Sequence, residues 1–316
     1  MGPQDDARRA AKAPRRAGAC HAGTASLNAS FRRKFNTFKH LLESRDIGRI
    51  CQLLLRRVFY FLYGFVVGKG IELTGDSVTL DGCHFSLAGA GILTSHKSTF
   101  LFGAYEKPER DAVTRFLRPD HPVVELGAGL GVVSCISNKR LTNQHAHVVV
   151  EANPLMIPLI EKNKAINRCH FRVMNAAVSY LDRPNTEIHL DQRFDRTSIL
   201  LPNGTNSVSV ETTTLRDILD KEDFPTFTLI CDVEGCEIDI IEYEIDLLKD
   251  RAVMTILELH PHLTGSEQAA AALGLLLQAG FKIIHSDVSV YTCINTAIYP
   301  EYAPSQESRH KTHSSW

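Results

Sequence analysis

The spacing of apolar and polar residues changes repeatedly along the chain, and the change predicts the order of the elements. Short runs that are apolar at nearly every position are typical of strands buried on both faces, and they occur at 122–126, 147–151, 171–178, 227–231 and 252–259. Segments with apolar residues at helical spacing follow them, at 131–141, 159–167, 215–224, 236–250 and 266–281. This alternation predicts an α/β fold, a doubly wound and mostly parallel sheet with helices on both faces.

The residues before this series have a different character. Residues 1–45 are rich in Ala, Arg and Ser, so we expect a basic tail without a packed core, with an organelle transit peptide as the alternative. Residues 46–104 combine an apolar stretch with short alternating runs, which predicts an amphipathic helix and a small β lead-in. We therefore expect the α/β domain over residues 105–302 and a C-terminal tail over 303–316.

The apolar stretch at residues 50–67 is interrupted by Arg56 and Arg57. Neither apolar half reaches the ~20 residues that a membrane-spanning helix needs. We expect a helix that packs on the α/β domain, with peripheral contact to a membrane surface as the alternative.

Charge and cysteine usage narrow the class of protein. The formal net charge is -1, which gives no support for nucleic-acid binding. The eight cysteines are scattered without a CxxC pair, which is typical of reduced thiols and not of a disulfide framework or a zinc site. Together with the lack of a signal-peptide apolar region after Met1, this favours a cytoplasmic protein, and the oligomeric state stays open.

A glycine-rich turn, VVELGAGLGVV, joins the first strand of the α/β domain to its helix. Gly127, Gly129 and Gly131 let the backbone approach a ligand, and Glu151, at the end of the next strand, is placed to accept hydrogen bonds from ribose hydroxyls. Val132 stands where the dinucleotide fingerprint has its third glycine, which disfavours a dehydrogenase. Glu125 would repel a pyrophosphate but suits a ligand with an ammonium group, as in S-adenosylmethionine (SAM).

The segments VVELGAGLGVVS, VVVEANP, NAAVS, VETTTLRDIL, CDVEGCEIDII and LELHP follow one another in this order. With them the chain resembles the FkbM-type family of class I SAM-dependent methyltransferases, from about residue 104 to the last strands. The resemblance implies S-adenosyl-L-methionine as cofactor and a hydroxyl of a sugar, glycan or glycosylated metabolite as methyl acceptor. One position differs, because family members often carry Lys where Ile230 stands.

The resemblance also implies a role for individual residues of the cofactor site. The methionine end of the cofactor would contact the glycine turn, namely Gly127, Ala128, Gly129 and Gly131, with Glu125 taking the ammonium group. The ribose and adenine would contact Glu151, Ala152, Asn153, Asn175 and Ala176. Tyr105 and Glu106 would close over the cofactor from the lead-in segment.

Three carboxylates follow the strand at 227–231, namely Asp232, Glu234 and Glu237. A hydroxyl is a poor nucleophile, so a positioned base assists methyl transfer to it. We predict that Asp232 orients or deprotonates the acceptor, that Glu234 assists, and that His260, like His262, is an alternative base. For Glu237 we predict only a favourable interaction with the helix N-terminus.

Other interpretations of this acidic cluster stay open. Asp232, Glu234, Glu258 and His260 could ligate a divalent ion, but no motif spacing enforces it, and we predict no metal. The acceptor could instead be a nitrogen of a protein or an amine. A third interpretation is a SAM-fold protein that binds without catalysis, which the complete set of glycines and carboxylates disfavours.

Overall fold

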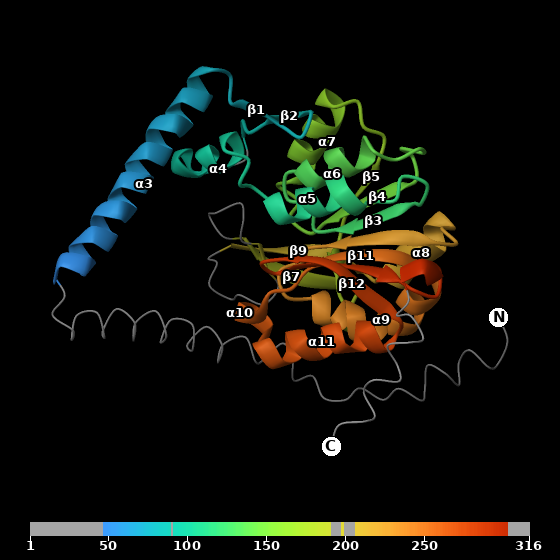
Figure 1. The fold of residues 1–316 in the computed structure, drawn as a ribbon. Helices are drawn as coiled ribbons and strands as arrows, with labels where there is room; N and C mark the ends of the chain where they lie inside the picture. Colours follow the sequence, from blue (N-terminus) through green and yellow to red (C-terminus); the bar gives the residue numbers. More distant parts are fainter. Residues whose placement is uncertain (1–46, 90, 191–196, 199–205, 303–316) are drawn as a thin grey trace.

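The computed structural model describes residues 47–89, 91–190, 197–198 and 206–302, so the predicted tails at 1–45 and 303–316 lie outside it. A seven-stranded sheet forms the centre of the described chain, in the order β12-β13-β11-β10-β3-β4-β5 (Figure 1). Its strands are β3 (Val123–Leu126), β4 (His147–Glu151), β5 (Arg172–Asn175), β10 (Phe227–Cys231), β11 (Ala252–Glu258), β12 (Phe281–Asp287) and β13 (Val290–Asn295). Strand β13 is antiparallel to β11 and β12, and the other strand pairs of this sheet are parallel. The predicted mostly parallel α/β fold is confirmed.

Helices cover both faces of this sheet (Figure 1). One face carries α5 (Lys107–Phe116), α6 (Val132–Asn138) and α7 (Ile157–Ile166), and the other carries α8 (Leu215–Glu222), α9 (Glu237–Arg251) and α11 (Ser266–Gln278). Alternate strand residues serve the two faces: Ile230 belongs to the core under α5 and α6, and Leu229 and Cys231 belong to the core over α8 and α9. Strands that are apolar at every position are thus explained by burial on both sides.

The strand order places two loops against each other. After β3 the chain adds β4 and β5 on one side, and after β10 it adds β11 on the other, so the order reverses between β3 and β10. The amide of Asp232 donates to the carbonyl of Leu126 across this junction (2.8 Å). Ligands of open α/β sheets bind outside the carboxyl ends of the strands at such a reversal.

A second sheet, in the order β6-β9-β7-β8, lies beside the first. It consists of β6 (Ala177–Val178), β7 (Asn185–Leu190), β8 (Thr197–Ser198) and β9 (Asn206–Thr213). The prediction of one strand over 171–178 is wrong, because β5 ends at Asn175 and β6 pairs with β9 in this second sheet. Asn175 interrupts the apolar run, but a single polar residue inside it does not reveal the change of partner.

The N-terminal lead-in has the predicted helix and hairpin. It comprises α3 (Ile47–Leu73), the antiparallel pair β1 (Ser77–Leu80) and β2 (Cys83–Ser86), the short helix η1 (Thr94–His96) and α4 (Lys97–Leu101). Helix α3 packs on η1 through Gly64 and Gly68, and a Cβ on Gly68 would lie 1.7 Å from the carbonyl oxygen of Thr94. The chain also forms α10 (Pro261–Thr264) and η2 (Pro300–Tyr302).

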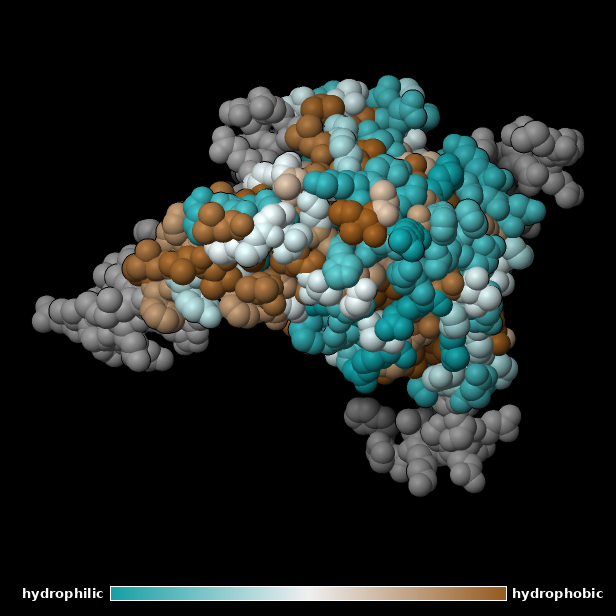
Figure 2. Space-filling view, turned by 90° about the horizontal axis from the view of Figure 1, so that it is seen from above, coloured by the Kyte–Doolittle hydropathy of each residue, from teal (hydrophilic) through white to brown (hydrophobic). Residues whose placement is uncertain are grey.

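The expectation that this helix packs on the α/β domain is wrong for most of its length, because α3 packs on η1, α4 and β1 of the lead-in and then extends away from the α/β domain (Figure 1). Apolar side chains of α3 are exposed along it, including Phe59, Phe61 and Val66, and Figure 2 shows apolar residues gathered on this projecting part. Within the described residues, no helix has the length and apolar character needed to cross a membrane.

The cysteines fit the prediction of reduced thiols as far as they are described. Six are free, and all of them except Cys236 are buried, namely Cys83, Cys135, Cys169, Cys231 and Cys293. Cys20 and the side chain of Cys51 lie outside the described part of the structure.

Candidate active site

A cavity of about 210 Å³ opens at the carboxyl ends of β3, β4 and β10, where the strand order reverses. Its walls come from the glycine turn, the end of β4, the loop after β10 and the residue pair before α5. The lining residues are Tyr105, Glu106, Gly127, Gly129, Val150, Glu151, Ala152, Met156, Ala176, Ala177, Val178, Ile188, Asp232, Val233, Glu234 and Cys236. Most residues predicted from the sequence are thus brought to one place.

The glycine turn requires glycine because its backbone has positive φ angles and because other atoms lie where a Cβ would stand. Gly127 has a φ of +84°, and a Cβ there would lie 1.7 Å from the carbonyl oxygen of Asp232. Gly129 has a φ of +53°, and its Cβ would lie 3.1 Å from the Tyr105 hydroxyl. Gly131, with a φ of +74°, is the residue before α6 and shapes the turn without lining the cavity. The turn after β3 therefore packs backbone to backbone on the loop after β10.

Glu151 orders this turn. Its Oε2 accepts from the amides of Ala128 (3.0 Å) and Gly129 (2.9 Å), and its Oε1 accepts from the amide of Asn153 (2.8 Å). Burial raises the pKa of the Glu151 carboxyl, against the opposing effect of these amides. The carboxylate lines the cavity and joins the ends of β3 and β4, and its predicted contact with a ribose stays a prediction.

Glu125 is buried beside the main cavity. Its side chain is 1% exposed and lies under the glycine turn, where it accepts from the Ser134 hydroxyl (2.7 Å) and contacts Nε2 of His147 (3.2 Å). It does not line the main cavity but lines a small adjoining one, together with Glu106, Gly127 and Asp232. Alternation along β3 turns the side chain toward α6, and its predicted contact with the cofactor's ammonium group stays a prediction.

Two predicted asparagines support the cavity from outside. Oδ1 of Asn153 accepts from the backbone amide of Leu155 (3.0 Å). The side-chain Nδ2 of Asn175 donates to the backbone carbonyls of Glu151 (2.9 Å) and Ala152 (3.0 Å). Ala152 and Ala176 do line the cavity, whereas Ala128 does not. The sequence missed an apolar wall formed by Met156, Ala177, Val178 and Ile188. Ile188 comes from β7 in the second sheet, and no sequence signal places it here.

Tyr105 and Glu106 close the cavity from the segment before α5. The Tyr105 ring stacks on Phe100, with 4.0 Å between ring centroids. Glu106 has a left-handed backbone with a φ of 45°, which is uncommon for a residue other than glycine. Burial raises the pKa of both side chains well above their ordinary values.

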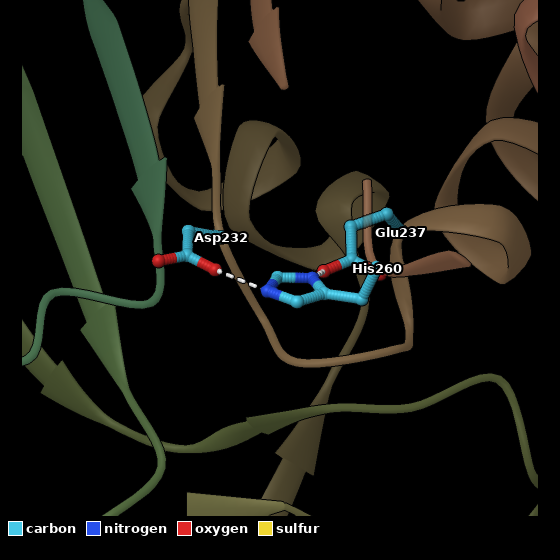
Figure 3. A group of neighbouring side chains, drawn as sticks. All are labelled: Asp232, Glu237 and His260. Carbon is cyan, nitrogen blue, oxygen red and sulfur yellow. Dashed lines mark hydrogen bonds and ion pairs between the residues drawn. The ribbon is translucent and has the colours of Figure 1, made fainter. Parts of the chain in front are cut away.

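On the β10 side of the cavity, carboxylates surround His260, which does not itself line the cavity; Figure 3 shows two of them, Asp232 and Glu237. The imidazole lies between two of them, with Nδ1 bonded to Oε1 of Glu237 (2.7 Å) and Nε2 facing Oδ1 of Asp232 (3.6 Å). Glu234 and Glu258 also approach Nε2, at 3.7 and 3.9 Å. His262 is exposed on α10 and contacts His260 edge to face.

The charges of this cluster decide the state of His260. Burial alone would lower the pKa of its imidazole, but the hydrogen bond and charge of Glu237, together with Asp232 and Glu234, raise it to about 10. Burial, and then the charge of Glu258, raise the pKa of Asp232 well above its ordinary value. In the ligand-free cluster His260 is a cation at neutral pH. It is therefore not the free base that the sequence suggested as an alternative.

Glu237 makes a contact in the site that the sequence did not predict. It is the first residue of α9, as expected of a carboxylate that favours a helix N-terminus, but it is also 1% exposed and bonded to His260. The amides of Val233 (3.3 Å) and Gly235 (3.0 Å) donate to it. The loop after β10 turns back on itself to allow this, and the residue spacing does not show that turn.

Residues 125–283, half of the chain, match the family model described as the methyltransferase FkbM domain. The chain belongs to this family. It is therefore a SAM-dependent methyltransferase, and the cavity lies within the matched region except for Tyr105 and Glu106. No curated protein matches it.

Solved structures resemble this FkbM-family methyltransferase at low sequence identity. A protein of the NADB-Rossmann superfamily from Streptococcus agalactiae is 13% identical with a TM-score of 0.35, over 59% of this chain and 65% of that chain. A precorrin-6y C5,15-methyltransferase from Geobacter metallireducens is 14% identical with a TM-score of 0.36, over 59% and 84%. Pyrococcus horikoshii TYW2, in complex with MeSAdo, is 13% identical with a TM-score of 0.36, over 69% and 68%.

Proposed function

We propose that this methyltransferase binds SAM in the cavity and transfers its methyl group to a hydroxyl of a sugar, glycan or glycosylated metabolite. One observation carries the proposal. A single cavity is lined by Glu151, at the end of β4, and by Asp232 and Glu234, after β10, and β3 lies between these two strands. A bound cofactor would then present its methyl group to an acceptor held at Asp232 and Glu234, here called the acidic end.

The lining residues suit each part of the cofactor. The apolar wall of Met156, Val178 and Ile188 fits the flat adenine, and Glu151 beside it fits the ribose hydroxyls. The methionine part is an ammonium carboxylate with a positive sulfonium. Because Glu106 lines the cavity beside Gly129, we assign the ammonium group to it and leave Asp232 to the acceptor.

The acidic end suits an acceptor with several hydroxyls. In-line transfer requires the acceptor oxygen about 3–3.5 Å from the methyl carbon and opposite the sulfur. Asp232 is placed to orient or deprotonate that oxygen. Glu234 offers a further acceptor for a neighbouring hydroxyl, and the same charges disfavour an anionic acceptor.

Calorimetric titration of the full chain with SAM, S-adenosylhomocysteine and NAD tests the cofactor assignment. We expect both adenosyl ligands to bind and NAD not to bind. Glu151→Ala should abolish binding, and Glu161→Ala, on the exposed side of α7, should leave it unchanged. Absence of SAM binding by the folded protein would remove the assignment.

The acceptor class is tested with SAM labelled with ¹³C in its methyl group. The protein is incubated with a panel of sugars, glycosides and amines, and the products are analysed by NMR and mass spectrometry. We expect a methoxy signal that is lost in Asp232→Asn. An N-methyl signal would instead support the amine or protein acceptor and overturn the hydroxyl assignment.

A further inference from the structure

The surroundings of His260 Nε2 are unusual for a buried imidazole. Carboxylate oxygens of Asp232, Glu234 and Glu258 face it at 3.6, 3.7 and 3.9 Å. Each of these separations exceeds the reach of an N–H···O hydrogen bond, about 3.2 Å. The His260 side chain is only 6% exposed, so this nitrogen points into the protein and not into open solvent.

Such separations are those of ligands that share an ion. Two donor atoms that each lie about 2.1 Å from a metal are about 3.0 Å apart at a right angle and about 3.5 Å apart at a tetrahedral angle. Among the described residues, Asp232, Glu237 and His260 each offer a donor atom within 4.8 Å of the others, so Asp232 and the imidazole are close enough to share an ion. Glu234 and Glu258 lie outside this group and would join a coordination shell around Nε2 by side-chain movements.

A second observation points to a missing partner. Oδ1 of Asp232, the oxygen that faces His260, is buried and has no hydrogen-bond partner among the described residues. A buried carboxylate oxygen without a donor is costly, and a cation between it and Nε2 would satisfy both.

Glu237 already provides the support that metal-bound histidines have in proteins. It bonds Nδ1 of His260 at 2.7 Å and is itself held by the amides of Val233 and Gly235. A carboxylate on the distal nitrogen fixes the tautomer and orients Nε2 toward an ion. Figure 3 shows this order, with the imidazole between Glu237 on one side and Asp232 on the other.

We propose that His260 Nε2, Asp232, Glu234 and Glu258 bind one divalent first-row transition ion, such as Mn²⁺ or Zn²⁺, at the acceptor end of the cavity. Mixed imidazole and carboxylate ligands suit these ions better than Mg²⁺ or Ca²⁺, which prefer oxygen ligands only. The site reverses the expectation from the sequence that no metal takes part. It goes beyond the proposed function, because ion binding is measurable without SAM or an acceptor.

The ion would change how the acceptor is activated. A hydroxyl bound to it has a lowered pKa and releases its proton to solvent at the exposed edge near Glu234. The oxygen then forms the bond to the methyl carbon as the carbon–sulfur bond breaks, which leaves S-adenosylhomocysteine. Asp232 orients the acceptor through the ion in this arrangement and does not take the proton itself.

The test uses the full chain after chelation and buffer exchange. Mn²⁺ binding is followed by electron paramagnetic resonance, and Mn²⁺ and Zn²⁺ binding by calorimetry. We expect one ion per chain, an at least 100-fold weaker affinity in His260→Gln and Asp232→Asn, and a 10- to 100-fold weaker affinity in Glu237→Gln. His262→Gln, the same change on the exposed neighbouring histidine, should leave the affinity unchanged.

Two outcomes overturn the inference: no saturable binding of either ion to the wild-type chain, or binding that His260→Gln does not weaken. If circular dichroism shows that His260→Gln is unfolded, Glu234→Gln replaces it, because Glu234 lies on a turn with 31% of its side chain exposed. SAM titration in the presence of chelator separates the two proposals. A chain that binds SAM but no ion loses only the metal site, and a chain that binds the ion but no SAM loses only the cofactor assignment.

Discussion

The two ends of the cavity are built in opposite ways. At the Glu151 end, three backbone amides already hold both carboxylate oxygens, and the glycine turn is fixed by contact with another backbone segment. At the His260 end, carboxylates crowd around one ring, and only Glu237 lies within hydrogen-bond distance of it. The first end is complete before a ligand arrives, whereas at the second the buried Oδ1 of Asp232 has no hydrogen-bond partner among the described residues.

The largest effect is expected at the glycine turn, which joins the two ends. Gly127→Ala would place a Cβ 1.7 Å from the carbonyl oxygen of Asp232, in a left-handed conformation. We expect a loss of about 3–5 kcal/mol in the free energy of unfolding, from overpacking and backbone strain together. Gly75→Ala is the matched control, because Gly75 also has positive φ but no atom lies within 4 Å of its Cβ position. Equal losses in the two variants, measured by chemical denaturation, would contradict the close contact.

The next largest effect is expected at Glu151, whose carboxylate accepts from three backbone amides. Glu151→Ala leaves the amides of Ala128, Gly129 and Asn153 without their acceptor, so we expect a loss of about 2–4 kcal/mol in unfolding free energy. Glu151→Gln keeps one carbonyl acceptor and should lose about half as much. Thermal and denaturant unfolding of both variants checks this. A stable Glu151→Ala would mean that the turn is ordered without the carboxylate.

Around His260, a substitution should lower the rate and leave cofactor binding nearly unchanged. Glu237→Gln weakens the support of His260, and we expect kcat to fall about 10- to 100-fold while the Kd for SAM changes less than about threefold. Glu242→Gln, on the exposed side of the same helix, should change neither. A weaker affinity for SAM with unchanged kcat would contradict this prediction, because Glu237 would then support cofactor binding and not the reaction.

The smallest effect concerns backbone strain at the acidic end. Glu234 has a φ of 54°, a conformation that costs a residue with a side chain about 1–2 kcal/mol. Glu234→Gly should therefore raise the free energy of unfolding by up to about 1 kcal/mol and lower the activity. Asp223→Gly, at φ 52° after α8, should give a similar gain in stability with unchanged activity. If both variants keep full activity, the Glu234 side chain has no part in the reaction.

The sequence predicted most of the fold and the residues that lie on a strand end or a glycine turn. Gly127, Glu151 and Asp232 were placed correctly because burial on both faces and the strand–turn–helix order determine where each strand ends. The sequence did not show that Glu125 lies outside the main cavity, because the direction of its side chain depends on alternation along a four-residue strand. Ile188 lines the cavity from a second sheet, and Glu237 bonds His260 from another strand end, and such long-range contacts leave no local pattern.

The contact between Gly127 and the carbonyl of Asp232 has a consequence for how this enzyme could acquire new substrates. Because backbone atoms make this contact, replacing side chains does not change the distance between the turn after β3 and the loop after β10. Diversification toward a larger or smaller acceptor is therefore confined to the periphery, at residues such as Glu234 and His262. Directed evolution of acceptor choice should concentrate its libraries on those positions and leave the junction untouched.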